Sequence, residues 1–112
     1  MAARMTDTPG TEPRFDPLIH PSPRISLVAI LAAADWVDFA YLKEQLALSD
    51  SALSKHLSTL EAAGYVDTRR PSTGRRRSVR ASLTTAGRAA FAGHVAALRG
   101  IINTAVDHDD AL

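Results

Sequence analysis

One stretch of this 112-residue chain constrains its fold more than any other, namely residues 49–66, SDSALSKHLSTLEAAGYV in one-letter code. Leu53, Leu57 and Leu60 recur at helical spacing, which predicts a helix with one buried edge. Ser49 is a suitable N-cap residue, and Gly64 can adopt the left-handed conformation that ends many helices. We therefore predict a helix over residues 50–63 whose opposite edge is small and polar.

A second amphipathic pattern comes just before this helix. Phe39, Leu42 and Leu46 follow one another at spacings of three and four, and Asp38 is a plausible N-cap. Only a short turn over residues 47–49 separates the two patterns. Two helices joined in this way predict a helix-turn-helix.

A β-hairpin with a basic tip is expected after the second helix. Residues 65–70 are β-prone, residues 71–74 (PSTG) have turn chemistry, and residues 78–83 alternate between apolar and polar. In this alternation Val79, Ala81 and Leu83 are set against Ser78, Arg80 and Ser82. The tip carries three consecutive arginines, Arg75, Arg76 and Arg77.

Two further helices flank these elements. The first is expected to start with Ser22 as N-cap and Pro23 in its first turn, and a very short strand is expected at residues 36–37. The last should be capped by Thr84 or Thr85 and should reach about residue 106. The predicted fold class is mainly α with a small β-hairpin, in the order helix, short strand, helix, helix, strand, hairpin turn, strand, helix.

The length predicts one domain over residues 15–106, between a disordered tail at residues 1–14 and an acidic tail at residues 107–112. The chain has no cysteine, which excludes disulfides, thiolate metal sites and thiol catalysis. Neither an 18-residue apolar run nor a secretory signal is recognised in the sequence, so we expect a cytoplasmic protein without a membrane span.

Positive charge is concentrated in one part of the chain. Residues 51–90 carry eight basic side chains and two acidic ones, although the net charge of the whole chain is only +1. Such a local surplus is typical of a surface that binds nucleic acid. The predicted DNA-contacting residues are Ser51, Ala52, Ser54, Lys55 and Ser58 on the helix and Arg69, Arg70, Thr73, Arg75, Arg76 and Arg77 in the hairpin.

Within this set, small hydroxyl side chains let a helix lie deep in a major groove. Arg75, nearest the tip, is the predicted minor-groove residue. Arg80, at the hairpin base, is the least certain of the basic residues, since some of those there can pair with Asp67 or Glu61. His56 lies beside a core leucine and is interpreted as a structural hydrogen-bonding residue.

The last helix has more apolar surface than a small monomer can cover. Phe91, Val95, Leu98 and Ile102 recur at spacings of four and three, which is the pattern of a helix–helix seam. A second side is made of small residues. We therefore predict homodimerisation through this helix; the alternative is a helix buried wholly within a monomer.

The sequence indicates no enzyme, no cofactor and no metal site. A phosphate-binding glycine loop, a metalloprotease motif and a nucleophile elbow are all missing from the sequence. His94, His108 and Asp109 would together make a metal site across a dimer, but the preferred interpretation is that they are surface polar residues.

Several motifs resemble the winged-helix transcription regulators, in particular the short MarR-like and ArsR-like group. These motifs are residues 15–20 (FDPLIH) with 24–25 (RI), 37–39 (VDF), 49–57 (SDSALSKHL), 60–66 (LEAAGYV), the arginine-rich wing and 83–88 (LTTAGR), and the resemblance covers residues 15–106. It implies a winged helix-turn-helix and a homodimeric cytoplasmic regulator, usually a repressor, with recognition helix 50–63 and wing 71–77. Metal-sensing relatives carry cysteines that this chain lacks, and ligand-sensing relatives are longer.

The expected function is therefore sequence-specific binding of a pseudo-palindromic DNA duplex by a homodimer. Two alternatives remain open. One is a winged helix that binds proteins rather than DNA. The other is a switch in which a small-molecule effector binds in the dimer cleft near Trp36, Tyr41 and the first helix.

Overall fold

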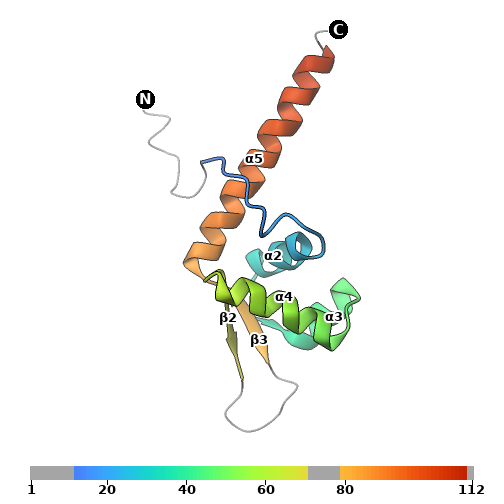
Figure 1. Ribbon diagram of the computed structural model, residues 1–112, viewed down its shortest axis with the longest axis vertical. Helices are drawn as coiled ribbons and strands as arrows, with labels where there is room; N and C mark the ends of the chain where they lie inside the picture. Colours follow the sequence, from blue (N-terminus) through green and yellow to red (C-terminus); the bar gives the residue numbers. More distant parts are fainter. Residues whose placement is uncertain (1–11, 71–78, 111–112) are drawn as a thin grey trace.

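The computed structural model describes residues 12–70 and 79–110, which form helices around a small sheet (Figure 1). The elements are α2 (Arg24–Ala32), β1 (Val37–Asp38), α3 (Phe39–Leu46), α4 (Asp50–Ala62), β2 (Val66–Arg69), β3 (Arg80–Leu83) and α5 (Thr85–Asp110). Their order confirms the predicted fold class and element order. The core between them is mostly leucine and valine, with Leu27, Val28, Leu31, Leu42, Leu53 and Leu60 all fully buried.

The first helix begins later than the sequence predicts. α2 starts at Arg24 with Pro23 in the N-cap position, and no side chain caps it. In its first turn the amides of Ile25 and Leu27 donate to the carbonyls of Pro21 and Pro23. Ser22 is therefore not the N-cap, because the chain enters the helix one residue later. The Arg24 side chain instead holds the preceding segment through a 2.6 Å bond from its Nε to the Leu18 carbonyl.

The three strands form one antiparallel sheet in the order β1-β3-β2. β3 is the central strand, paired with β2 from Val66 opposite Leu83 to Arg69 opposite Arg80. Ser82 is only 9% exposed, although it is one of the polar residues of the alternating pattern. β3 contacts α2 and α5 in addition to both neighbouring strands, which shields Ser82 from solvent.

The helix-turn-helix forms as predicted. Asp38 occupies the N-cap position of α3, although its side chain makes no capping bond. The Oγ of Ser49 caps α4 by accepting a 3.1 Å bond from the Ala52 amide. At the other end Gly64 is left-handed with φ of 83°, and the amides of Gly64 and Tyr65 donate to the carbonyls of Glu61 and Leu60. These two bonds are the Schellman motif, which satisfies the last carbonyls of the helix.

The last helix is longer than predicted and extends well beyond the rest of the fold (Figure 1). α5 runs to Asp110, four residues past the expected end, and Thr84 caps its start by accepting a 3.0 Å bond from the Gly87 amide. Gly93 and His94 are buried, whereas every residue from Arg99 to Val106 is exposed.

The apolar character of α5 corrects another expectation. Within Thr85–Val106 an 18-residue window has a mean hydropathy of 1.2, and only 11% of that window is buried. By length and composition alone such a helix is apolar enough to cross a membrane, although no 18-residue apolar run was recognised in the sequence. The core helix of a soluble protein passes the same test, so this property is weak evidence for a membrane span.

Candidate nucleic-acid interface

The exposed edge of α4 is the first part of the candidate interface. Ser51, Ser54, Lys55 and Ser58 are all exposed, and Ala52 lies half-buried at the margin. The capping bond at Ser49 sets where the helix begins, and burial of three leucines sets which edge faces outward. The structure thus exposes the predicted recognition residues along one side of one helix, and Ala52 to a lesser degree.

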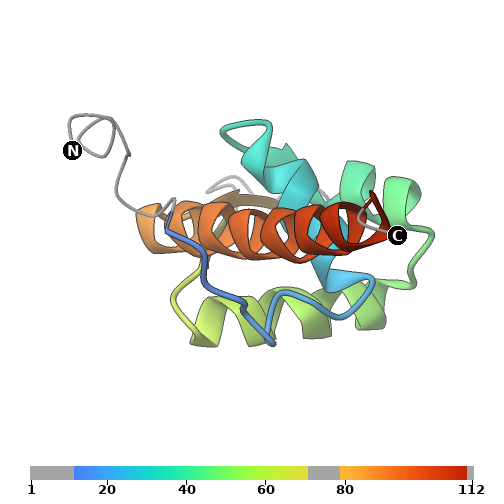
Figure 2. The ribbon, with the colours of Figure 1, turned by 90° about the horizontal axis from the view of Figure 1, so that it is seen from above.

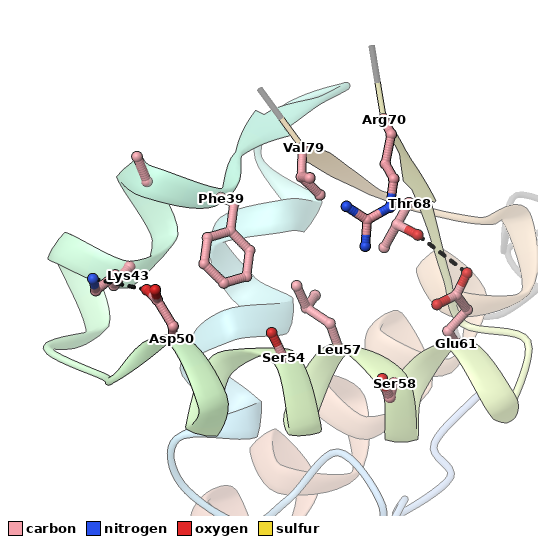
Figure 3. A pocket seen from close by; sticks show the side chains of 11 residues that line it. Phe39, Lys43, Asp50, Ser54, Leu57, Ser58, Glu61, Thr68, Arg70 and Val79 are labelled. Carbon is pink, nitrogen blue, oxygen red and sulfur yellow. Dashed lines mark hydrogen bonds and ion pairs between the residues drawn. The ribbon is translucent and has the colours of Figure 1, made fainter. Parts of the chain in front are cut away.

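A hollow of about 700 Å³ lies beside this edge, between α3, α4 and the hairpin (Figure 3). Its apolar lining comes from Phe39, Leu57 and Val79. Ser54 and Ser58 line it from α4, and Arg70 points into it from the end of β2. The helix edge and the base of the hairpin therefore border one concave surface.

Both signs of charge occur around this hollow. At one end the Nζ of Lys43 lies 2.7 Å from the Oδ1 of Asp50, and at the other end Thr68 Oγ1 donates a 3.2 Å bond to Glu61 Oε2. The Lys43–Asp50 pair is exposed and contributes little to stability. Within the described ranges, no carboxylate lies within ion-pair distance of Arg70. Arg70 is thus a cation directed into the hollow and available to an anionic partner.

Other basic residues have partners within the chain. Arg69 lies over the Trp36 ring, with its guanidinium carbon 4.5 Å from the ring centroid. The Nε of Arg80 lies 3.8 Å from the Oδ1 of Asp38, so Arg80 pairs with Asp38 rather than with Asp67 or Glu61. Arg88 donates to the carbonyls of Ala32 and Ala34 at 3.3 and 3.0 Å and so closes the end of α2. Arg88 therefore supports the fold and does not add to the charged surface.

The remaining hairpin predictions are outside the part of the chain that the structure describes. Thr73, Arg75, Arg76 and Arg77 all fall within residues 71–78. Their role in DNA binding stays a prediction from the sequence. The described strands do place residues 70 and 79, which flank this segment, beside the hollow (Figure 3).

The predicted dimerisation residues fall into two groups. Phe91 is half-buried and packs against the core of its own chain, and Val95 and Leu98 are also half-buried. Ile102 is 58% exposed, and Ile101 and Val106 beside it are 59% and 50% exposed. The outer part of α5 therefore carries large apolar side chains that nothing in the described chain covers.

Sequence reasoning missed a cluster of polar side chains on the other side of α4. His94, interpreted as a surface residue, is fully buried, and its ring contacts His20 and the backbone of Asp16. The Oη of Tyr65 donates a 2.6 Å bond to Asp16 Oδ2. No sequence signal pointed to this cluster, because up to 78 residues separate its members. The described residues contain no group of three or more side chains that could hold a metal.

The interpretation of His56 also needs revision. His56 does not act as a structural hydrogen-bonding residue, since its buried Nδ1 has no partner among the described residues. Burial, helped by the nearby charges of Arg24 and Lys55, lowers the pKa of His56. Trp36 and Tyr41 do not line this hollow, and the small-molecule site expected near them in a dimer cleft stays a prediction.

Comparisons with known proteins concern the family and the fold. Residues 24–102 match the family described as "Winged helix DNA-binding domain". An uncharacterized protein of Methanocaldococcus jannaschii is 35% identical over 72 residues, which cover 64% of this chain and 78% of that protein.

Solved structures of transcriptional regulators share the fold. A transcriptional regulator homologue from Pyrococcus horikoshii OT3 superposes with a TM-score of 0.72 at 21% identity, covering 78% of this chain and 86% of that chain. A MarR family regulator from Silicibacter pomeroyi gives a TM-score of 0.55 at 32% identity, covering 66% of this chain and 49% of that chain.

Proposed function

The chain belongs to the winged helix DNA-binding domain family, and from this premise we propose that it is a homodimeric, sequence-specific regulator of transcription, acting as a repressor in the cytoplasm. In this proposal α4 enters the major groove of a pseudo-palindromic duplex, and wing 71–77 enters the adjacent minor groove. The observation that carries the proposal is that the small polar edge of α4 and the Arg70 side chain border the same hollow (Figure 3).

The chemistry of the α4 edge suits a duplex. Ser51, Ser54 and Ser58 are short, so the helix backbone can approach base edges closely, and their hydroxyls can bond either bases or phosphates. Lys55 and Arg70 supply cations at the helix and at the hairpin base. The carboxylate of Glu61 also lines this hollow and disfavours a phosphate next to it, which restricts the paths that a DNA backbone can follow.

The outer part of α5 supports the dimer. Ile101, Ile102 and Val106 are half or more exposed on a helix that stands clear of the domain (Figure 1). An isolated helical extension gains little from propensity alone, so its stability must come from packing. A second copy of α5 would cover these side chains. It would also supply a second α4, as needed for two half-sites spaced ~34 Å apart.

The test is a fluorescence anisotropy titration with duplexes selected from a randomised pool, repeated at several salt concentrations. We expect binding that weakens as salt rises, with the salt slope reduced by about one for each phosphate-contacting cation removed. Lys55→Ala and Arg75→Ala should both weaken binding. Arg99→Ala, which removes an exposed cation of α5 far from the hollow, is the matched control.

Two outcomes would contradict the proposal. Unchanged affinity in both Lys55→Ala and Arg75→Ala would remove the roles given to the helix and the wing. Negligible DNA affinity at moderate salt, together with a protein partner retained in a pull-down, would favour the alternative that this winged helix binds proteins.

A further inference from the structure

The polar cluster beside α5 joins three separate parts of the chain. Asp16 and His20 come from the segment before α2, Tyr65 follows α4, and His94 lies on α5. The Asp16 amide donates to Nδ1 of His94 at 2.9 Å, and Nε2 of His94 lies 3.2 Å from Nδ1 of His20. The Asp16 carboxylate accepts from Tyr65 Oη and from the Leu18 amide. This arrangement connects the N-terminal segment to α5 and to the end of α4.

The hydrogen bonds determine where the protons of the two imidazoles lie. A backbone amide can only donate, so Nδ1 of His94 must be an unprotonated acceptor. The proton of neutral His94 is therefore on Nε2, and it is donated to Nδ1 of His20. His20 must then carry its own proton on Nε2. With its only lone-pair nitrogen already used by Asp16, His94 is a poor metal ligand in this arrangement.

A further proton on either ring breaks this arrangement. On His94 it would face the Asp16 amide, so that two donors oppose each other. On His20 it would face the Nε2 proton of His94, with the same result. The cluster is therefore satisfied only while both imidazoles are neutral.

Burial makes this neutral state the favoured one. His94 is fully buried, and the loss of solvation lowers its pKa from the ordinary 6.5. The neighbouring His20 lowers this pKa further, whereas the Asp16 carboxylate opposes the shift. The ring of Phe15 packs against both imidazoles with centroid distances of 4.9 Å, so no solvent layer separates these three rings.

We propose that residues 14–20 form a pH-sensitive latch that is closed near neutral pH, opens on mild acidification, and controls how firmly the end of α4 is held. The closed latch also includes a 2.9 Å bond from the Arg14 amide to the Gly93 carbonyl. Figure 2 shows the segment before α2 running alongside α5. Opening removes the acceptor of Tyr65 Oη. Tyr65 is the residue whose amide completes the cap of α4 and whose carbonyl accepts from the Thr84 amide.

Other ionisable groups lie near the latch, and their contribution to the pH dependence must be distinguished from that of His20 and His94. Arg14 belongs to the latch segment itself, and Arg24 is bonded to it through the Leu18 carbonyl. Tyr65 has its pKa raised, chiefly by the bond to Asp16, and stays neutral. His56 on α4 titrates in the same direction as His94, because burial lowers its pKa as well. A variant of His56 is therefore the necessary control.

The test is NMR of the full chain from about pH 8 to about pH 5, the range in which histidine changes charge. Long-range proton–nitrogen spectra should show His94 with its proton on Nε2 at neutral pH. The Arg14 and Asp16 amide signals should move together with the His94 ring signals as the latch opens. His20→Asn retains an acceptor oxygen near the Nδ1 position but gains no proton, so its transition should move to lower pH. His56→Asn should leave the transition unchanged.

Three results would overturn the latch: a His94 proton on Nδ1, amide signals of residues 14–20 that stay constant over the titration, or an identical transition in His20→Asn. Since His20 is exposed, its variant should fold even if substitution of His94 does not.

A second measurement tests the connection to α4, which rests on the proposed DNA binding. The wild-type chain should lose roughly fivefold or more in affinity for its preferred duplex on acidification, and His20→Asn should lose less. Equal losses in both proteins would refute control of α4 by the latch. A complete lack of DNA binding at neutral pH would refute the proposed function, and the NMR titration would then judge the latch by itself.

Discussion

Arg69 places its guanidinium group over the indole ring of Trp36, 4.5 Å from the ring centroid. Its neighbour Arg70 points the other way, into the hollow beside α4 (Figure 3). Arg69 is the last residue of β2 and Arg70 follows it, and consecutive side chains of extended backbone face opposite sides, so their partners differ even though their chemistry is the same. The sequence predicted DNA contact for both, whereas the structure leaves only Arg70 directed into the candidate interface.

Replacement of these two arginines should therefore have different effects. Arg70→Ala should weaken DNA binding and reduce the salt slope by about one, because it removes a cation that is free to meet a phosphate. Arg69→Ala should cost about 0.5–1 kcal/mol of stability through the lost cation–π contact, and should shift the emission of Trp36. Anisotropy at several salt concentrations and urea unfolding measure the two effects. An equal change of salt slope in both variants would show that Arg69 also reaches DNA.

Two glycines of α5 provide a matched pair. A Cβ at Gly87 would collide with the Tyr65 carbonyl and crowd Leu83, whereas a Cβ at Gly100 would meet nothing within 4 Å. Gly87→Ala should destabilise the fold by about 1–3 kcal/mol, as for other overpacked sites. Gly100→Ala should stabilise it by about 0.5–1 kcal/mol, because alanine is the better helix former. The denaturant midpoints of unfolding measure both changes in stability. A Gly87→Ala protein as stable as the wild type would show that α5 packs against β2 and β3 differently from the structure described.

The exposed end of α5 should decide the oligomeric state. Ile102→Glu places a charge in the proposed dimer contact and should yield monomers, which size-exclusion chromatography with light scattering detects. Tyr41→Glu is the control, because Tyr41 on α3 is 50% exposed and Ile102 is 58% exposed. A wild-type chain that is monomeric in solution but is retained on lipid vesicles would contradict the dimer and favour a membrane role for α5.

His56 should make the protein less stable in acid. The pKa of His56 in the folded chain lies below the ordinary 6.5. At pH values between this folded-state pKa and 6.5, the unfolded chain therefore binds more protons than the folded chain. The contribution of neutral His56 is therefore complete above that window and is lost as the pH falls through it. His56→Leu removes this dependence and also removes the unpartnered Nδ1, so it should stabilise the fold by about 1 kcal/mol near neutral pH. Urea unfolding at several pH values tests both, and a destabilised variant would indicate a hydrogen bond to His56 in solution.

Local signals predicted most of the fold. The Ser49 cap, the Gly64 terminus and the leucine edge of α4 all involve residues within a few positions of one another, and each is confirmed. The start of α2 was missed because capping preference alone does not decide between adjacent residues. Alternation along β3 does not reveal the burial of Ser82, because the contacts of this strand with α2 and α5 are made by distant segments.

The candidate interface was also predicted only in part. Helical spacing alone identified the exposed serines and Lys55. Spacing did not reveal that Arg88 closes α2 from 54 and 56 positions away, so counting basic residues overestimated the charged surface. The sequence indicated that hairpin-base arginines can approach Glu61, but it did not reveal that Glu61 and Arg70 line one hollow.

The sequence alone thus determined which segments are helical, where α4 begins and ends, and which edge of α4 faces water. A repeat of 3.6 residues and a helix cap are properties of short segments, so neighbouring residues are enough to specify them. The folded structure alone decided which arginines remain free and which histidines lie in contact. Such contacts depend on how distant segments pack, and no local pattern encodes that His20 and His94, 74 positions apart, share a hydrogen bond.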